Sequence, residues 1–228
     1  MLCIIQARMS SKRFKGKMLE AFYGDPVLKS LVNRLLLCKS VSKIIIATSV
    51  QSSDNILAEY CSAIGVGFFR GSLENVASRF KDIILSENAP AFMRISGDSP
   101  LIDPDLIDKS IDIFNNEDID LFTNVFPRTF PKGQSIEIIK SKVFLDTYKL
   151  MKTKEQLEHV TVFFYENNKN FKILNLNAPE DYSDVNLCID NPDDIDFLEK
   201  VLKKTDGDST YWKDLADSYR NIKSDITI

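Results

Sequence analysis

The chain opens with Leu2-Cys-Ile-Ile-Gln6, an apolar run that is followed at once by Ala7-Arg-Met-Ser-Ser-Lys-Arg-Phe-Lys-Gly-Lys17. A short run without polar alternation is typical of a strand that is buried on both faces of a parallel sheet. The segment after it carries five positive charges within ten residues, so it cannot continue a buried strand. The first unit that the sequence predicts is therefore a buried strand that ends in a basic loop.

The same kind of unit recurs along the first half of the chain. Helix-period apolar residues are clearest from Val27 to Leu36 and from Ile56 to Ile64, and Gly65 is placed to end the second helix. Between the helical stretches lie further short apolar runs at Lys43–Thr48, Val66–Phe69, Ala91–Ile95 and Asp120–Thr123. Alternating strands and helices predict an α/β fold with a mostly parallel central sheet flanked by helices.

The rhythm changes after residue 124, where Pro127, Pro131 and Gly133 precede the alternating strand Ser135–Lys140. We interpret residues 125–140 as a β-arm insertion. Beyond it the pattern predicts helices over Lys142–Met151, Glu155–Asn167 and Pro192–Lys203, and strands near Phe171–Leu176 and Asn186–Ile189. The last ten residues are polar and are expected to fray. A length of 228 residues with 44% hydrophobic residues fits a single domain, 1–228.

Composition excludes several classes of function. The formal net charge is −4, which argues against a broad basic surface for nucleic acid. The four cysteines are scattered and there is one histidine, so no zinc pattern is present and a reducing compartment is expected. The apolar run at the start is too short for a signal-peptide core, and no stretch is long enough to span a membrane. We therefore expect a cytoplasmic protein without a membrane or nucleic-acid partner.

The basic loop is the first candidate site. In open α/β sheets, ligands bind beyond the carboxyl ends of the strands, and the loop follows that end of the first strand. Arg, Lys and Ser side chains together can hold a triphosphate. The loop is not a Walker A motif, because Ser11 stands where the first glycine is needed and Met18 follows Gly16-Lys17. The alternative is a solvated basic loop that only keeps the protein soluble.

Two strand ends carry acids. Arg94-Ile-Ser-Gly-Asp98 places an aspartate after an apolar strand and next to a glycine, and Cys188-Ile-Asp190 repeats the arrangement before a helix that begins at Pro192. Such carboxylates suit a magnesium ion that is held jointly with phosphate oxygens. The alternatives are structural: Asp98 as a turn residue that binds its own backbone, and Asp190 as a helix N-cap. Nucleotidyl transfer would need both the acids and the basic loop.

Several stretches together resemble a known family, the spore-coat polysaccharide biosynthesis protein F-like cytidylyltransferases, which are related to the acylneuraminate and 3-deoxy-manno-octulosonate cytidylyltransferases. The stretches keep the family's order along nearly the whole chain. The specific ones are Ile4–Leu19 and Arg94–Asp103, and the others are Ala47–Ser49, Phe69–Ser72, Glu158–Thr161 and Ile189–Asp194. The resemblance implies a glycosyltransferase-A-like (nucleotide-diphospho-sugar transferase) fold and transfer of a cytidylyl group from CTP to a sugar acid or related acceptor, with release of pyrophosphate.

The resemblance also implies roles for particular residues. Lys17, Arg13 and Asp98 would be catalytic, and Asp98 and Asp190 would hold Mg²⁺. Nucleotide contacts would come from Gln6, Ala7, Arg8, Ser10, Arg13, Lys17, Arg94 and Gly97. Candidate acceptor contacts are Lys132, Glu137 and His159, and for His159 a hydrogen-bonded structural histidine is the alternative.

The expected arm departs from the family's pattern. Where the family commonly has Gly-Leu-Asp-Val-Glu, this chain has Gly133-Gln-Ser-Ile-Glu137, so a usual acid is missing. Asn75 likewise stands where the family often has an aspartate. The family's habit predicts a homodimer in which the arm reaches the partner chain.

The function predicted from the sequence is thus a Mg²⁺-dependent cytidylyltransferase that makes a CMP-activated sugar for surface polysaccharide or glycoconjugate biosynthesis. Two alternatives stay open at this point. One is a glycosyltransferase that uses a preformed nucleotide sugar, against which the dense basic loop argues. The other is a non-catalytic nucleotide-binding subunit, which the missing acid favours.

Overall fold

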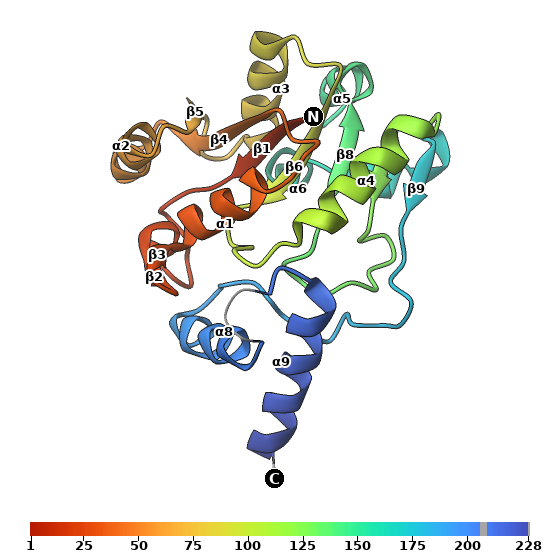
Figure 1. The fold of residues 1–228 in the computed structure, drawn as a ribbon. Helices are drawn as coiled ribbons and strands as arrows, with labels where there is room; N and C mark the ends of the chain where they lie inside the picture. Colours follow the sequence, from red (N-terminus) through yellow and green to blue (C-terminus); the bar gives the residue numbers. More distant parts are fainter. Residues whose placement is uncertain (206–208, 228) are drawn as a thin grey trace.

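A seven-stranded sheet forms the centre of the protein (Figure 1). The computed structural model describes residues 1–205 and 209–227. The strands follow the spatial order β5-β4-β1-β6-β8-β7-β9. Their bounds are β1 (Leu2–Gln6), β4 (Lys43–Ser49), β5 (Gly67–Gly71), β6 (Ala91–Ser96), β7 (Leu121–Thr123), β8 (Glu137–Lys140) and β9 (Ile173–Asn175).

The predicted strand β1 lies at the middle of the sheet. It pairs in parallel with β4 on one side and with β6 on the other, so that Ile4 stands opposite Ile45 and Arg94. The strand is buried on both faces, which explains the uniform apolar run in the sequence. Only β8 runs antiparallel to its neighbours β6 and β7. The mostly parallel α/β fold is therefore confirmed.

Helices cover both faces of the sheet and create two hydrophobic cores. One core packs α1 and α4 against the sheet and continues into α8 and α9, which lie together at the bottom of Figure 1. The other core contains α3, α5 and α7. The helices are α1 (Val27–Leu36), α2 (Asn55–Ala63), α3 (Val76–Glu87), α4 (Pro104–Asn116), α5 (Ser141–Tyr148), α6 (Lys154–Glu158), α7 (Val162–Glu166), α8 (Pro192–Lys204) and α9 (Trp212–Thr227).

A short hairpin of β2 (Ala21–Phe22) and β3 (Asp25–Pro26) connects the basic loop to α1. Gly65 has φ +70° just after α2, as expected for the residue that ends that helix. Over residues 1–205 and 209–227, no helix combines the length and the apolar character that crossing a bilayer requires.

The segment expected to form an arm lies against its own chain. Its second part is β8, an internal strand of the sheet. In its first part Gln134 is fully buried, donates to the carbonyl of Leu101 (2.7 Å) and accepts from the amide of Asp103 (2.9 Å). Asn124 binds the backbone on both sides of this turn, at Gln134 and Ile136. These contacts make residues 125–140 part of the body of the fold.

Two other expectations from the sequence were wrong. The helix expected over Glu155–Asn167 is broken into α6 and α7, because residues 159–161 leave the helical conformation. Asn186–Ile189 forms a single bridge to Lys132 and no strand, since its apolar side chains are buried by loop packing. The last ten residues were also expected to fray. Helix α9 extends to Thr227 and Tyr219 joins the first core, while residue 228 lies outside the described residues, so fraying of this end stays a prediction.

Gly133 is predicted to be required for the fold. It has φ +93°, and a Cβ there would come within 2.8 Å of the backbone of Leu187. Gly133→Ala should lower the free energy of unfolding by about 3 kcal/mol, of which about 1–2 kcal/mol is the left-handed backbone alone. Gly24→Ala is the matched control, because Gly24 has φ +88° with no heavy atom within 4 Å of its Cβ position. Denaturant titration of both variants should give the larger loss for Gly133→Ala, and equal losses would contradict the steric argument.

Candidate functional site

A cleft of about 370 Å³ lies beyond the carboxyl ends of β1 and β6. The basic loop forms one wall, the end of β6 forms the floor, and the ends of α6 and of the loop before α8 close the sides. Five cations and three carboxylates line it, which fits an anionic ligand. The lining residues are Gln6, Ala7, Arg8, Ser11, Lys12, Arg13, Lys17, Met18, Arg94, Ser96, Gly97, Asp98, Glu158, His159 and Asp190.

The ammonium group of Lys17 contacts both predicted acids, Asp98 after β6 and Asp190 before α8. Its Nζ donates to the carbonyl of Ile189 (2.8 Å) and to one oxygen each of Asp98 and Asp190 (both 3.2 Å). The side chain is 10% exposed, so these contacts are poorly screened by solvent. Arg13 reaches the same carboxylate of Asp190 from the exposed side of the loop, at 2.9 Å. Residues that are far apart in the sequence thus share one charged cluster.

The structural alternatives for the two aspartates do not apply. Asn191, and not Asp190, occupies the N-cap position of α8. Asp194 accepts from the backbone amides of Asp190 and Asn191 (both 2.7 Å), so the Asp190 side chain is free to contact Lys17 and Arg13. The Asp98 carboxylate contacts Lys17 and the hydroxyl of Ser99. Both carboxylates therefore line the cleft and contact Lys17, and neither binds its own backbone as the alternatives required.

Gly97 brings the basic loop close to the end of β6. Its amide donates to the carbonyl of Gln6 (2.9 Å), and a Cβ at this position would meet Met18 Sδ at 2.8 Å and the Ala7 side chain at 3.0 Å. Any larger residue would push the loop away from Asp98. The structure therefore shows a packing role for Gly97, while its nucleotide contact stays a prediction.

Asp54 fixes the backbone of the basic loop, although sequence reasoning did not select it. This residue is fully buried and accepts from the amides of Met9 (2.7 Å) and Ser49 (3.2 Å) and from the hydroxyl of Ser49. It thereby ties the end of β4 to the residue that follows Arg8. The signal in the sequence was an acid just before a predicted helix, which is also the ordinary signature of a helix cap.

Arg94 is oriented by a buried acid behind the cleft. Glu137 is 3% exposed and accepts from Arg94 and from the hydroxyl of Tyr165, which also contacts Thr123. Burial alone would raise the pKa of Glu137, but the charge of Arg94 and hydrogen bonds from Tyr165, Thr161 and Arg94 outweigh it and lower the pKa. The second guanidinium nitrogen of Arg94 donates to the side chain of Gln6 at 3.3 Å. Glu137 thus lies behind Arg94 and positions it.

The remaining predicted residues divide into two groups. Arg8 and His159 line the cleft, and Arg8 pairs with Glu158, the neighbour of His159, at 3.0 Å. His159 is exposed at the break between α6 and α7, so it is not a buried structural histidine. Ser10 and Lys132 do not line the cleft. Lys132 is exposed, and its backbone exchanges hydrogen bonds with Val185 and Leu187.

The oxygen donors at Asp98 and Asp190 are suited to Mg²⁺ only with help from a ligand. Over the described part of the chain, no group of three or more His, Cys, Asp or Glu side chains is placed to hold a metal ion. Two carboxylates do converge on Lys17, however. Magnesium is typically bound in proteins by one or two carboxylates, with phosphate oxygens and waters completing its octahedron. The residues present fit that arrangement.

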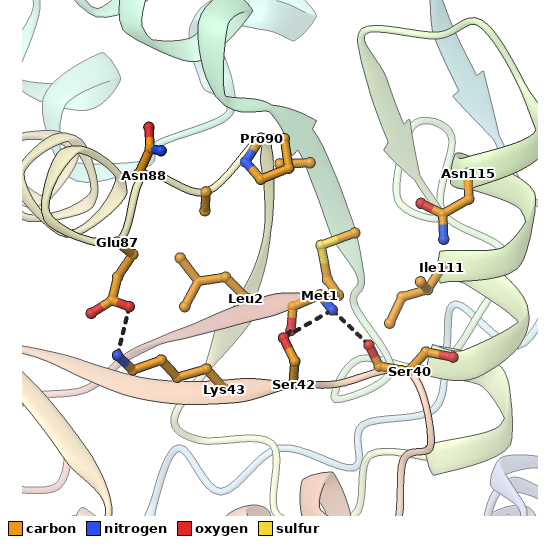
Figure 2. Close-up of a pocket in the computed structure, with 12 residues that line it drawn as sticks. Met1, Leu2, Ser40, Ser42, Lys43, Glu87, Asn88, Pro90, Ile111 and Asn115 are labelled. Carbon is orange, nitrogen blue, oxygen red and sulfur yellow. Dashed lines mark hydrogen bonds and ion pairs between the residues drawn. The ribbon is translucent and has the colours of Figure 1, made fainter.

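A second cavity, of about 550 Å³, lies at the opposite edge of the sheet (Figure 2). It is formed at the amino ends of β1, β4 and β6, and the Lys43–Glu87 ion pair (2.6 Å) crosses one side of it. Figure 2 shows a wall of mixed apolar and amide side chains without a cluster of acids or bases. The clustered charges that an anionic ligand would need lie at the smaller cleft and not at this cavity.

Comparison with known proteins identifies the family of the chain. The family model described as cytidylyltransferase matches residues 2–222. The spore coat polysaccharide biosynthesis protein SpsF of Bacillus subtilis is 30% identical over 210 residues, covering 89% of this chain and 86% of the relative.

Solved structures show the same relationship. A cytidylyltransferase from Leptospira borgpetersenii superposes with a TM-score of 0.89 and 28% identity over 99% of this chain and 94% of that one. A CMP:2-keto-3-deoxy-manno-octonic acid synthetase complexed with CTP superposes with a TM-score of 0.70 over 90% of this chain and 98% of that one, at 15% identity, which speaks to the fold alone.

The buried pair of Arg94 and Glu137 predicts a pH-dependent loss of stability. Glu137→Gln leaves the Arg94 guanidinium, 18% exposed, without its carboxylate, and should cost about 2–4 kcal/mol at pH 7. The pKa of Glu137 is lower in the folded than in the unfolded state, so its contribution is complete above its ordinary pKa and is lost as pH falls through the folded value.

Denaturation at several pH values tests this prediction. The stability gap between wild type and Glu137→Gln should narrow as the pH is lowered from about 5. Asp118→Asn is the control, because Asp118 forms its ion pairs with Lys140 and Lys172 on the exposed surface and its loss should barely change stability. A gap that stays constant down to strongly acidic pH would show that the charge of Glu137 is not what stabilises the fold.

Proposed function

The chain belongs to the cytidylyltransferase family, and we propose that it transfers the cytidylyl group of CTP to a sugar acid or related sugar-like acceptor, with release of pyrophosphate. The observation that carries the proposal is the convergence of two acids, Asp98 after β6 and Asp190 before α8, on Lys17 of the basic loop. A triphosphate placed against this loop would meet Arg8, Arg13 and Lys17 at the carboxyl edge of the sheet, where ligands of such folds bind.

The reaction follows from the charges in the cleft. An oxygen of the acceptor attacks the α-phosphorus of CTP in line, a new phosphorus–oxygen bond forms, and the bond to the bridging oxygen of the pyrophosphate breaks. The leaving group departs with the negative charge, so the work of the protein is to position the reactants and to neutralise that charge. Lys17, which is buried and close to both acids, would stabilise the transferring phosphoryl group. The exposed Arg13 would contact the outer phosphates.

Mg²⁺ would be held by Asp98 and Asp190 together with phosphate oxygens. When bound, it would neutralise charge on the phosphates and on the leaving pyrophosphate. The Asp98 and Asp190 carboxylates are held apart from their own backbones and share the Lys17 ammonium, so they are available to exchange that partner for a cation and a phosphate. The magnesium requirement is our proposal from this donor set.

The acceptor would approach from the side of Arg94 and His159. His159 and Glu158 also line the cleft: the imidazole can donate to an oxygen of the acceptor, and the Glu158 carboxylate can accept from a sugar hydroxyl. Arg94 is held rigidly by Glu137, which suits a contact that must be made in one geometry. Lys132 stays a predicted contact that would need movement toward the cleft. The SpsF relative is a spore coat polysaccharide biosynthesis protein, and we propose surface-polysaccharide or glycoconjugate biosynthesis as the setting here.

Two further properties belong to the proposal. The four cysteines are free, and Cys3, Cys38 and Cys61 are buried, which supports a reducing, cytoplasmic setting. A homodimer stays a prediction from the family's habit, to be checked by light scattering.

Pyrophosphate release is the direct test. The protein is incubated with Mg²⁺ and a panel of sugar acids, amino sugars and phosphosugars. We expect pyrophosphate to be released from CTP and not from the other three nucleoside triphosphates. Splitting the panel would then name the acceptor. CTP-dependent stabilisation without any release would favour a binding subunit. Sugar transfer from a nucleotide sugar without pyrophosphate would favour a glycosyltransferase.

Lys17→Ala should reduce turnover by at least about 100-fold, because it removes the buried cation next to the transferring group. Lys15→Ala is the matched control, since Lys15 belongs to the same loop but is exposed outside the cleft, and it should keep near wild-type turnover. Melting temperatures would show that both variants fold. Comparable rates for the two variants would mean that the loop acts only through its overall charge.

Asp98→Asn and Asp190→Asn should each weaken the response to Mg²⁺. Titration of the CTP-bound protein with Mg²⁺, followed by calorimetry as well as by turnover, should give a dissociation constant raised about tenfold or more, since each change removes one anionic ligand. Asp193→Asn is the control, because Asp193 lies in the first turn of α8, is exposed and does not line the cleft. Unchanged magnesium affinity in both cleft variants would exclude these acids as the metal ligands.

A further inference from the structure

A fully buried arginine lies behind the basic loop. Arg79, on α3, has no exposed surface, and its Nη1 donates to the carbonyl of Ala47 at 2.8 Å. Its Nε and Nη2 are buried without a hydrogen-bond partner, and it makes no ion pair with any carboxylate in the part of the chain that the structure describes. Burial of a charged group with so few partners is costly, and proteins generally avoid it. Arg79 needs a reason beyond packing.

The surroundings of Arg79 connect it to the cleft. Ala47 stands opposite Gln6 in the sheet, and its carbonyl also accepts from the amide of Ala7 (3.3 Å), which is the residue before Arg8. The guanidinium of Arg79 therefore sits at the carboxyl edge of β4, directly beside the start of the basic loop.

The sheet makes room for this side chain. A Cβ at Gly71, at the end of β5, would come within 2.8 Å of Arg79 Cγ. Gly71 is not among the glycines with positive φ, so its backbone conformation does not require glycine. What its missing side chain provides is space for the aliphatic part of Arg79.

Arg79 keeps its positive charge at neutral pH. Burial and then the nearby charge of Arg8 lower the pKa of Arg79 to about 10, against the opposing charges of Asp54 and Glu158. These three side chains are the charged groups that face it. Asp54 is already occupied by backbone amides and Ser49, and Glu158 by Arg8, so neither neutralises Arg79 directly.

We propose that Arg79 is a positioning residue for the polyphosphate of the nucleotide: a permanent, buried positive charge behind Arg8 that favours an anion in the cleft without touching it. This inference rests on the proposed nucleotide-binding function. In the free protein Arg8 is paired with Glu158, and Arg13 and Lys17 are paired with Asp190 and Asp98. An incoming triphosphate must compete with those carboxylates for the three cations.

The buried location makes the charge of Arg79 effective. A charge in the low-dielectric interior is weakly screened by salt and solvent, so it acts on a neighbouring cleft over a distance at which a surface charge would not. Its repulsion of Arg8 persists when an anion binds beside Arg8, but the attraction of both cations to that anion offsets it. Arg79 therefore raises the free energy of the empty cleft and lowers that of the occupied one.

The test is the affinity of the folded, full-length protein for CTP and for inorganic tripolyphosphate, measured by calorimetry. Arg79→Met keeps an apolar stem and removes the charge. We expect both dissociation constants to rise about tenfold or more, with KM for CTP rising more than kcat falls. The melting temperature should stay the same or rise, because replacing a buried, poorly paired ion by an apolar residue is commonly neutral or stabilising.

Arg34→Met is the matched control. Burial likewise lowers the pKa of Arg34 to about 10, but its guanidinium donates to four carbonyl oxygens, those of Leu101, Ile102, Ser209 and Thr210, away from the cleft. We expect a lower melting temperature for this variant and an unchanged affinity for CTP. Arg79→Met should weaken CTP binding without lowering the melting temperature, and Arg34→Met should lower the melting temperature without weakening CTP binding. This contrast separates a charge that serves binding from one that serves the fold.

Arg79→Lys keeps the inference testable if Arg79→Met does not fold. Its ammonium retains the charge but can lose its proton when buried. At each pH the affinity of this variant for tripolyphosphate is compared with that of the wild type. The two affinities should match while the ammonium is charged, and the variant should bind more weakly only at higher pH, where the ammonium loses its proton. Equal affinity of wild type and Arg79→Met, or an Arg79→Lys variant as weak as the neutral one at every pH, would overturn the proposal. Failure of the wild type to bind CTP or tripolyphosphate would instead refute the proposed function.

Discussion

The contact of one ammonium group with three oxygens organises the active side of this protein. Lys17 holds the carbonyl of Ile189 and the carboxylates of Asp98 and Asp190 within 3.2 Å, and it is almost buried while doing so. The amide of Ile189 donates to the carbonyl of Asp98, so the segment after β6 and the loop before α8 are also joined through their backbones. Removing water from these charges is favourable only if each finds its partner, and this demand fixes the loop, β6 and the start of α8 relative to one another.

The same cluster explains how a strongly charged cleft is tolerated before any substrate binds. Arg8, Arg13, Lys17 and Arg94 each have a carboxylate partner in the free protein. In the proposed reaction a triphosphate would replace the carboxylates as the partner of these cations, and a metal ion would replace Lys17 as the partner of the two aspartates. Preorganised charges of this kind need little rearrangement as charge moves onto a leaving group. Arg79 is the exception, since it is charged and buried and has no carboxylate partner among the described residues. In our proposal the attraction of a bound anion offsets the free-energy cost of burying this charge.

The sequence predicted those parts of the molecule whose signals are local. β1 was predicted with its observed bounds, because a strand buried on both faces is uniformly apolar. The basic loop and Asp98 were identified because both follow strand ends. The insertion of β8 between β6 and β7, the break at His159 and the role of Asp54 could not be derived, since each depends on contacts between distant residues. Arg79 was missed for the same reason: a single arginine in an amphipathic helix is usually a solvated residue.

The two departures from the family's pattern in residues 125–140 differ in physical meaning. Gln134 is fully buried and uses both ends of its amide to hold Leu101 and Asp103, so its choice is explained by the packing of the loop before α4. Ser135 is half-buried, and its hydroxyl accepts from Arg128 at 2.9 Å. An acid there would neutralise Arg128, whereas a serine leaves its charge in place, only a short way from Glu137 and Tyr165. The first departure therefore concerns the fold, and the second changes the charge near Arg128 and Glu137.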